Sequence, residues 1–332
     1  MDKYSHRERI EMIIAGEKPD RFAASFWRHF FHQEHYAAGT AEAMIGFQKE
    51  LDWDFVKVNP RADFHVEDWG LALEWSHNEF KKHRKVSFPI QQIEDWDKIG
   101  VNGLNAPSLA EHLQMVSLVR KGLGKEVPIL MTVFTPLSIA GRMVPDRQLL
   151  VEHLRNEPAR VHRALKAITE TFSAYATELR NAGADGLFYA TCQWASSDLI
   201  TWNEYQEFGI PYDLAVIEAT DEDAINLLHV CDSNNYLSRL ADIDYRCQLY
   251  NWDCLDETNL SIAEGSELLG QRPVVGGVAH ESWLWHGSPD EVVRRLNQLK
   301  REHSSARFIV GPGCAIPPEV PIANLHAIRE SL

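Results

Sequence analysis

Residues 273–314, PVVGGVAHESWLWHGSPDEVVRRLNQLKREHSSARFIVGPGC, decide the fold class of this 332-residue chain. The segment opens with an apolar, β-branched run (273–279) and closes with a second one (307–314). Between them lies an amphipathic segment of helical period (288–304), and its opening Ser-Pro pair suits an N-cap followed by the first helical position. A strand, a helix and a strand in this order predict a βαβ unit with parallel strands.

The same alternation runs through the rest of the chain. Six further strand candidates lie at residues 21–27, 55–60, 127–135, 185–191, 225–231 and 247–253. Amphipathic segments separate most of them, and residues 146–183 predict a helical pair broken near Pro158. Eight strands alternating with helices predict a (β/α)8 TIM barrel that spans residues 1–332 as a single domain. A doubly wound open sheet is the alternative, although its dinucleotide-binding form is disfavoured because no Gly-x-Gly-x-x-Gly turn follows the first strand.

The segment 61–100, between the second and third predicted strands, is too long for a plain crossover. The alternating pattern LALEW within it predicts an inserted β-hairpin over the barrel mouth.

Composition narrows the classes of function. The chain is 45% hydrophobic and 24% charged, which is typical of a globular protein with a large core. Its formal net charge of −15 argues against nucleic acid or an anionic membrane as a partner. No window approaches the ~18 apolar residues of a membrane helix, and the charged start does not resemble a secretory signal. Five scattered cysteines then predict reduced thiols and a cytoplasmic location.

A His-x-Cys pair ends the fifth predicted strand, in the stretch LLHVCDSNN (227–235). His229 and Cys231 are two residues apart and therefore face the same side of the strand. Cys314 ends the eighth predicted strand, and in a closed barrel the carboxyl ends of all strands meet at one mouth, where active sites are built. One nitrogen and two sulfur ligands suit zinc with an open fourth position. Ordinary core and loop residues are the alternative reading of the pair.

Longer stretches carry a resemblance to a known family. The chain resembles the uroporphyrinogen decarboxylase superfamily, and within it the zinc-dependent cobamide methyltransferase branch. The resemblance rests on SHRERIEMIIAGEKPDRF (5–22), AGADGLFYATCQWAS (182–196), VVGGVAHESWLWHGSPDEV (274–292) and FIVGPGCAIPPEVPIANLHAI (308–328). It implies that His229, Cys231 and Cys314 hold Zn²⁺. It also implies methyl transfer between a corrinoid (methylcobamide) on a partner protein and either a thiol or a small methyl donor.

The sequence departs from the family pattern at two places. Asp232 stands where the methyltransferase branch usually has Gly after the His-x-Cys pair. Arg28, within FWRHFFHQEH, is the sole plausible counterpart of the Arg-rich motif with which the decarboxylases hold substrate carboxylates. Metal-independent decarboxylation of a tetrapyrrole is therefore the alternative function. A non-catalytic barrel that binds zinc or a tetrapyrrole is another, although structural zinc sites usually have four closely spaced protein ligands.

Further residues near predicted strand ends are candidates for the pocket. The candidate substrate-binding residues are Trp27, Arg28, His29, Asn59 and Trp194, and the candidate catalytic residues are Asn251 and Asp253. The competing interpretation is packing for the two tryptophans, surface ion pairing for Arg28 and His29, and stabilisation of the loop for Asn59. His280 and His286 are candidates for a fourth ligand, whereas Cys192, Cys247 and Cys254 are expected to be small core residues.

Overall fold

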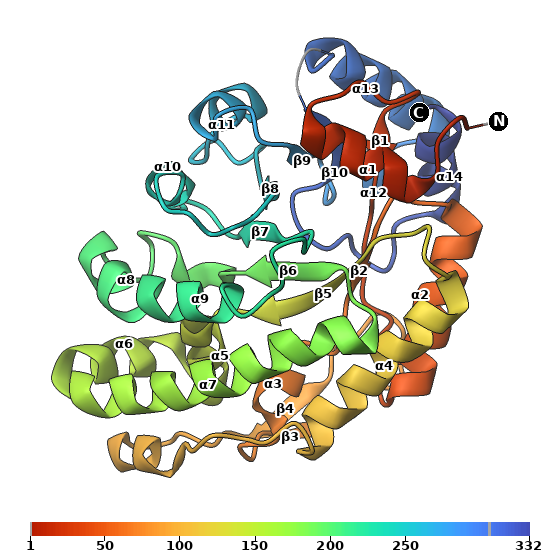
Figure 1. Ribbon diagram of the computed structural model, residues 1–332. Helices are drawn as coiled ribbons and strands as arrows, with labels where there is room; N and C mark the ends of the chain where they lie inside the picture. The colour runs from red at the N-terminus through yellow and green to blue at the C-terminus, as the bar shows by residue number, and fades with distance from the viewer. Residues whose placement is uncertain (1, 305–306) are drawn as a thin grey trace.

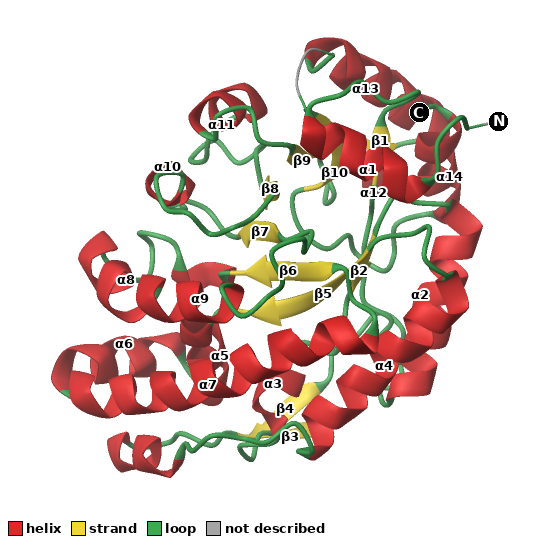
Figure 2. Ribbon diagram, viewed as in Figure 1, coloured by secondary structure: helices red, strands yellow, loops and turns green. Residues whose placement is uncertain are grey.

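The computed structural model describes residues 2–304 and 307–332. An eight-stranded parallel sheet occupies the centre of the molecule and helices surround it (Figures 1 and 2). Its order is β1-β10-β9-β8-β7-β6-β5-β2, so from β2 onward each strand of the curled sheet lies next to the one that follows it along the chain, while β1 and β2 stand at the two ends. The strands are β1 (Ala23–Ala24), β2 (Val56–Val58), β5 (Ile129–Phe134), β6 (Gly186–Ala190), β7 (Leu227–Val230), β8 (Leu249–Trp252), β9 (Val274–Val278) and β10 (Phe308–Pro312). All eight predicted strands are present, and the α/β arrangement fits a TIM barrel.

Helices surround the sheet. They are α1 (His6–Ala15), α2 (Ala37–Leu51), α3 (Phe64–Glu67), η1 (Ile93–Lys98), α4 (Pro107–Leu123), α5 (Pro136–Met143), α6 (Arg147–Asn156), α7 (Pro158–Ala182), η2 (Cys192–Trp194), α8 (Trp202–Phe208), α9 (Ile210–Ile217), α10 (Leu237–Leu240), α11 (Ile262–Leu268), α12 (Trp283–His286), α13 (Pro289–Glu302) and α14 (Ile322–Glu330). Of these, α1 precedes the first strand, α14 follows the last, and the others lie in the segments between strands. The predicted break at Pro158 separates α6 from α7. Ser288 caps α13 by accepting a hydrogen bond from the Glu291 amide.

The two ends of the sheet meet through a few hydrogen bonds. The Asp54 amide donates to the Ala24 carbonyl over 2.8 Å, and the Ser25 hydroxyl donates to the Phe55 carbonyl over 2.7 Å. These bonds connect the β1 and β2 segments, which stand at opposite ends of the strand order. The short β1 strand therefore stays attached on both sides.

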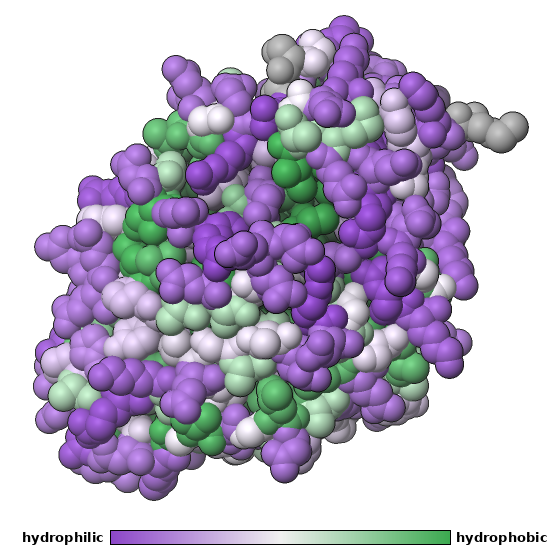
Figure 3. All heavy atoms as spheres, in the orientation of Figure 1, coloured by the Kyte–Doolittle hydropathy of each residue, from purple (hydrophilic) through white to green (hydrophobic). Residues whose placement is uncertain are grey.

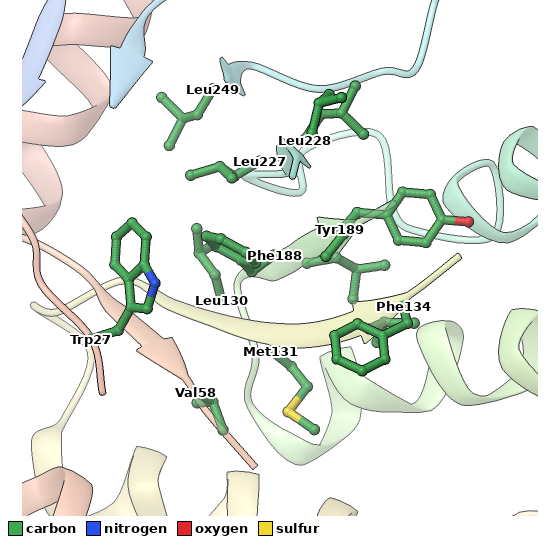
Figure 4. Close-up of a cluster of buried hydrophobic side chains, with 14 of the residues drawn as sticks. Trp27, Val58, Leu130, Met131, Phe134, Phe188, Tyr189, Leu227, Leu228 and Leu249 are labelled. Atoms are coloured by element: carbon green, nitrogen blue, oxygen red, sulfur yellow. The ribbon is translucent and has the colours of Figure 1, made fainter. Parts of the chain in front are cut away.

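Alternation along the strands sorts side chains between the interior and the helices. In Figure 4, Phe188, Leu227 and Leu249 point toward one region together with Trp27, whereas Tyr189 and Leu228 point away from it. The strand register pairs Leu227 with Phe188 and with Leu249, which places these three side chains in one interior layer.

Residues between β2 and η1 include a separate pair of strands. β3 (Ala72–Glu74) and β4 (Arg84–Ser87) form a two-stranded antiparallel sheet with an irregular register between Ala72 and Leu73. Both strands lie at the edge of the molecule in Figure 1, next to α3.

The face of the molecule drawn in Figure 3 is mainly hydrophilic. Figure 3 shows polar residues over most of the visible face, with smaller hydrophobic patches between them. Across residues 2–304 and 307–332, none of the helices combines the length and the apolar character that crossing a membrane requires.

A buried carboxyl group makes the stability of the fold depend on pH. Asp213 in α9 is fully buried and accepts hydrogen bonds from the hydroxyls of Tyr205 (2.6 Å) and Tyr245 (3.1 Å). Burial raises the pKa of Asp213 to about 7 from its usual 3.8, although both tyrosines lower it. Between about pH 4 and 7 the folded protein therefore holds a proton that the unfolded chain has lost, so this group makes stability fall as pH rises.

We expect Asp213→Asn to remove this dependence. The free energy of unfolding of the variant, relative to the native sequence, should increase by up to roughly 1.4 kcal/mol per pH unit between pH 4 and 7 and then level off. Urea unfolding of both proteins at pH 5, 6, 7 and 8 measures this, because other titrating groups cancel in the difference. A difference that stays constant with pH would contradict the raised pKa.

Candidate metal centre

Three soft ligand atoms lie together at the carboxyl end of the sheet. Alternation places His229 on the interior side of β7, and Cys231 follows two residues later on the same side. Cys314 comes two residues after the end of β10. The Cys314 sulfur lies 3.9 Å from His229 Nε2 and 4.0 Å from the Cys231 sulfur. All three ligand atoms are within 4.8 Å of one another, and among the described residues they form the one such group of three or more His, Cys, Asp or Glu side chains.

A hydrogen-bond chain fixes the orientation of His229. Asn251 is fully buried, and its amide nitrogen donates to the carbonyls of Val275 (2.7 Å) and Pro312 (3.0 Å). Its Oδ1 must then face His229 Nδ1, 2.6 Å away, and can only accept from it. Nδ1 therefore carries a proton, and Nε2 is the nitrogen that faces the sulfurs and that a metal would bind. Asn251, which the sequence predicts as a catalytic residue, contacts His229 on the side away from the sulfurs and orients its ring.

The two thiols share their protons unequally. A hydrogen bond from Cys231 holds the pKa of the Cys314 thiol well below its usual value, and His229 and Lys57 lower it further against the opposing effect of burial. The pKa of the Cys231 thiol is raised by the same hydrogen bond and by burial. Cys314 is therefore the sulfur that is ionised first, which is the form that binds a metal.

Two cavities meet at this cluster. The inner cavity encloses about 330 Å³ and extends into the barrel, with Lys57, Thr132, Phe188 and His229 among its lining residues. The outer cavity encloses about 560 Å³ and is lined mainly by the loops that follow β7, β8, β9 and β10. Residues that line both are His29, Phe31, Lys82, Cys231, Cys314 and Ala315. A ligand in either cavity can therefore reach the two sulfurs.

Three of the other sequence-predicted residues face these cavities. His29 lines both, and its Nδ1 lies 2.9 Å from the buried carboxylate of Glu34. Asn59 lines the inner cavity. Asp253 lines the outer cavity and lies close to Gly313, which follows β10. A Cβ atom at position 313 would lie 2.9 Å from Asp253 Oδ1, so glycine leaves that space free.

Three predicted substrate-binding residues lie outside both cavities. Trp27 is 2% exposed and packs against Phe188 inside the barrel (Figure 4). Trp194 has no exposed surface and lies against Gly141 of α5. Arg28 turns away, donates to the Pro318 carbonyl over 2.8 Å and stacks on the ring of Phe30. Each lies near a strand end as predicted, but packing and not the cavity determines its side-chain direction.

The remaining histidine and cysteine candidates divide between the outer cavity and the core. His280 lines the outer cavity, whereas His286 stacks on Trp285 and lines neither cavity. Cys247 and Cys254 are buried core residues, as expected. Cys192, also expected in the core, instead lines the inner cavity.

Lys57 also lines the inner cavity, although it is not among the residues predicted from the sequence. It pairs in register with Leu130, between two valines that are both buried, so its side chain points into the barrel. Burial lowers its pKa to about 8, although the nearby cysteines and Glu34 raise it, so the ammonium form still predominates at pH 7. The Val-Lys-Val pattern in a predicted barrel strand is the sequence signal by which Lys57 could have been found.

The curled sheet of eight parallel strands and the His-Cys-Cys cluster at their carboxyl ends place this protein among α/β barrels with a candidate site for a soft metal ion. The chain belongs to the uroporphyrinogen decarboxylase (URO-D) family, whose model matches residues 8–332. This confirms the resemblance seen in the sequence.

Two relatives with similar sequences have different names. The methylcobamide:CoM methyltransferase MtbA of Methanosarcina mazei is 24% identical over 99% of this chain and 98% of its own length. A uroporphyrinogen decarboxylase of Chlorobaculum tepidum is 26% identical over 74% of this chain and 70% of its own. The solved structure of a methyltransferase from Methanosarcina mazei superposes with a TM-score of 0.84 at 18% identity, covering 99% of this chain and 98% of that one, and this likeness concerns the fold.

Proposed function

We propose that this protein is an enzyme, a zinc-dependent methyltransferase that moves a methyl group between a corrinoid on a partner protein and a thiol or small methyl donor. The observation that carries the proposal is the convergence of His229, Cys231 and Cys314 at the junction of two cavities. Likeness over nearly the full chain to a methylcobamide:CoM methyltransferase supports it.

The ligand cluster fits zinc in its dimensions and its chemistry. Zn–S bonds of about 2.3 Å and Zn–N bonds of about 2.0 Å at tetrahedral angles place ligand atoms roughly 3.6–3.8 Å apart. Two of the three separations, 3.9 and 4.0 Å, are close to that, and the third lies within 4.8 Å. Asn251 directs His229 Nε2 toward the sulfurs, and the lowered pKa of the Cys314 thiol favours its thiolate, which is the form that zinc binds.

The residues of the chain divide the work of such a transfer. When bound, zinc would supply Lewis acidity that keeps a thiol as thiolate or polarises a methyl donor. His229, Cys231 and Cys314 would hold it and leave its fourth side toward the cavities. Asn251 keeps the His229 proton on Nδ1. The inner cavity shelters the small reactant inside the barrel, and the outer cavity leaves room for the second reactant at the mouth.

The proposal includes the finer features expected from the sequence. We propose one domain over residues 1–332, a cytoplasmic location, and the β3–β4 pair as an insertion beside the mouth. In support of the last point, Leu73, His83 and Lys85 from this segment line the inner cavity. Asp253 and His29 stay as candidate groups for contacting reactants, since both line the cavities.

A methyl-transfer assay tests the proposal. Purified protein is stripped of metal, reloaded with zinc and mixed with methylcobalamin and a panel of thiols, and the absorption change on demethylation is followed. We expect demethylation that requires both zinc and thiol. Consumption of uroporphyrinogen by the metal-free protein, with no demethylation, would instead favour the decarboxylase alternative. Tight zinc binding without either activity would favour a non-catalytic barrel.

A further inference from the structure

A histidine and a buried carboxylate form a dyad at the junction of the two cavities. His29 Nδ1 lies 2.9 Å from Glu34 Oε1, and the Phe30 amide donates to the same oxygen over 2.7 Å. Glu34 is 1% exposed, whereas His29 is more open and lines both cavities together with Cys231 and Cys314. A histidine that is held by a buried carboxylate and faces a cavity is the arrangement with which enzymes move protons.

The dyad leaves one ring nitrogen of His29 available. Burial would raise the pKa of Glu34, but His29 and the Phe30 amide more than offset it and hold the pKa below its usual value. The carboxylate is therefore ionised and can only accept, so Nδ1 carries a proton and Nε2 is the acceptor of the neutral ring. Among the residues that the structure describes, none forms a hydrogen bond with Nε2. Stacking on Phe31, with the two ring planes 10° apart, fixes the plane of the imidazole.

Other basic groups near the cluster are less suited to accept a proton at neutral pH. His83 Nδ1 already accepts from the Ser76 amide over 3.0 Å, so this nitrogen is occupied. The Lys57 ammonium, which has no ion-pair partner among the described residues, already carries its proton at pH 7. His280 lines the outer cavity alone. His29 is thus the histidine with an available nitrogen at the place where the two sulfurs lie.

The surroundings of His29 favour a positive charge on its ring. The charged and titratable groups that line the junction or face the ring are Glu34, Lys82, His83, Cys231 and Cys314. The outer cavity adds the carboxylates of Asp232, Asp253, Asp256 and Glu281. An imidazolium at His29 therefore has a carboxylate in direct contact and an acidic chamber on one side, and these outweigh the single cation of Lys82.

We propose that His29, held by Glu34, takes the proton of a thiol that enters the junction, so that the sulfur reaches the His-Cys-Cys cluster as a thiolate. The S–H bond breaks with its electron pair left on sulfur, and a new N–H bond forms at Nε2, which gives an imidazolium beside the Glu34 carboxylate. His29 acts on the reactant, and Glu34 positions the ring. The inference rests on the proposed function and adds the residue that accepts the thiol proton.

Two thiols of matched size and different acidity test this step. At pH 8 ethanethiol is largely protonated, whereas 2,2,2-trifluoroethanethiol is largely ionised and needs no base. In His29→Asn the side-chain amide can keep the hydrogen bond to Glu34 but has no basic nitrogen. We expect this variant to demethylate methylcobalamin about a hundredfold more slowly than the native protein with ethanethiol, and less than about threefold more slowly with trifluoroethanethiol. Equal ratios for the two thiols would overturn the proposal.

Two further variants separate the dyad from a purely structural role. Glu34→Gln keeps an acceptor for Nδ1 but removes the charge, so we expect roughly a tenfold loss with ethanethiol that shrinks as pH rises and the thiol ionises by itself. His326→Gln removes the histidine of an exposed pair, 3.4 Å from Glu50, and is the control that should behave like the native protein. Thermal melting shows that each variant folds. A loss in Glu34→Gln that is the same for both thiols and at every pH would overturn the dyad.

Proton counting separates the dyad from the proposed function. Calorimetric titration of the zinc-loaded protein with ethanethiol, in buffers of different ionisation enthalpy, gives the number of protons released on binding without any methyl transfer. At pH 7 we expect less than about half a proton from the native protein and about one from His29→Asn, because His29 retains the proton while the thiolate is bound.

The two proposals can then fail independently. The expected difference in proton release, in a protein that proves inactive with methylcobalamin, would support the dyad while the proposed function fails. Active methyl transfer with equal proton release by the native protein and His29→Asn would overturn the dyad while the proposed function stands.

Discussion

Cys314→Ser is expected to fold like the native protein, bind less than a tenth of a zinc equivalent after dialysis and lose at least a hundredfold in methyl transfer. A serine hydroxyl is close to a thiol in size, so packing around the half-buried position should change little. It is, however, a harder and far less acidic ligand than a thiolate, so the metal loses both a bond and charge donation. Cys314 is also the sulfur whose pKa is lowered, hence the one best prepared to bind.

Matched substitutions separate a loss of metal binding from a loss of folding stability. His229→Ala should lose zinc to a similar extent, because Nε2 is its sole contribution to the cluster. Cys247→Ser, at a buried cysteine that lies outside both cavities, should bind zinc like the native protein. Zinc stoichiometry and thermal melting are measured side by side on the three variants. A full zinc equivalent in Cys314→Ser, with full activity, would leave Cys314 as a small residue in a Gly-Pro turn.

The largest effect on stability is expected from Asp54→Asn, which should lower the free energy of unfolding by about 3–5 kcal/mol. Asp54 has no exposed surface and accepts from Arg9 (2.7 Å), from Arg21 (2.7 Å) and from the Ala24 amide (2.8 Å). Its amide also makes one of the hydrogen bonds between the β1 and β2 segments. An asparagine keeps the shape but removes the charge that two guanidinium groups share, and it turns one acceptor into a donor facing them.

The pH dependence of this variant has a definite sign. Burial would raise the pKa of Asp54, but hydrogen bonds from His6, Arg21 and the Ala24 amide more than offset it and hold the pKa below its usual value. Its contribution is therefore present above the unfolded pKa near 3.8 and is lost as pH falls through the lower folded value. Urea unfolding at pH 7 measures the loss. Asp52→Asn, at a half-exposed carboxylate nearby, is the control and should change stability by under about 1 kcal/mol. Equal effects of the two substitutions would contradict the role of the buried network.

Strand positions and the ligand cluster could be predicted because both follow from local pattern. Seven of the eight strands are short, mainly apolar runs that are buried on both faces, as a parallel barrel requires, and β2 differs by its half-buried Lys57. His229, Cys231 and Cys314 converge because strand alternation and parallel topology alone bring them to one mouth.

Side-chain directions in the loops could not be predicted in the same way. Trp27, Trp194 and Arg28 lie at strand ends, yet each turns into packing contacts formed by residues distant in the sequence. The position of Asn251 at a strand end predicts a site residue, but its role depends on carbonyls of β9 and β10 whose positions the sequence alone does not give. Lys57 illustrates the converse, since its unpaired charge becomes visible once the carboxylates around it are located.

The most direct test of the central claim, that His229, Cys231 and Cys314 hold a zinc ion with one side open to a reactant, is zinc K-edge X-ray absorption of the zinc-loaded protein before and after thiol is added. We predict one nitrogen and two sulfur ligands from the protein, with a light atom in the fourth position, and a third sulfur when 3-mercaptopropionate is present. The Cys231→Ser variant should show one sulfur fewer in both states. Four protein ligands that do not change on adding thiol, or a zinc environment without sulfur, would contradict the account.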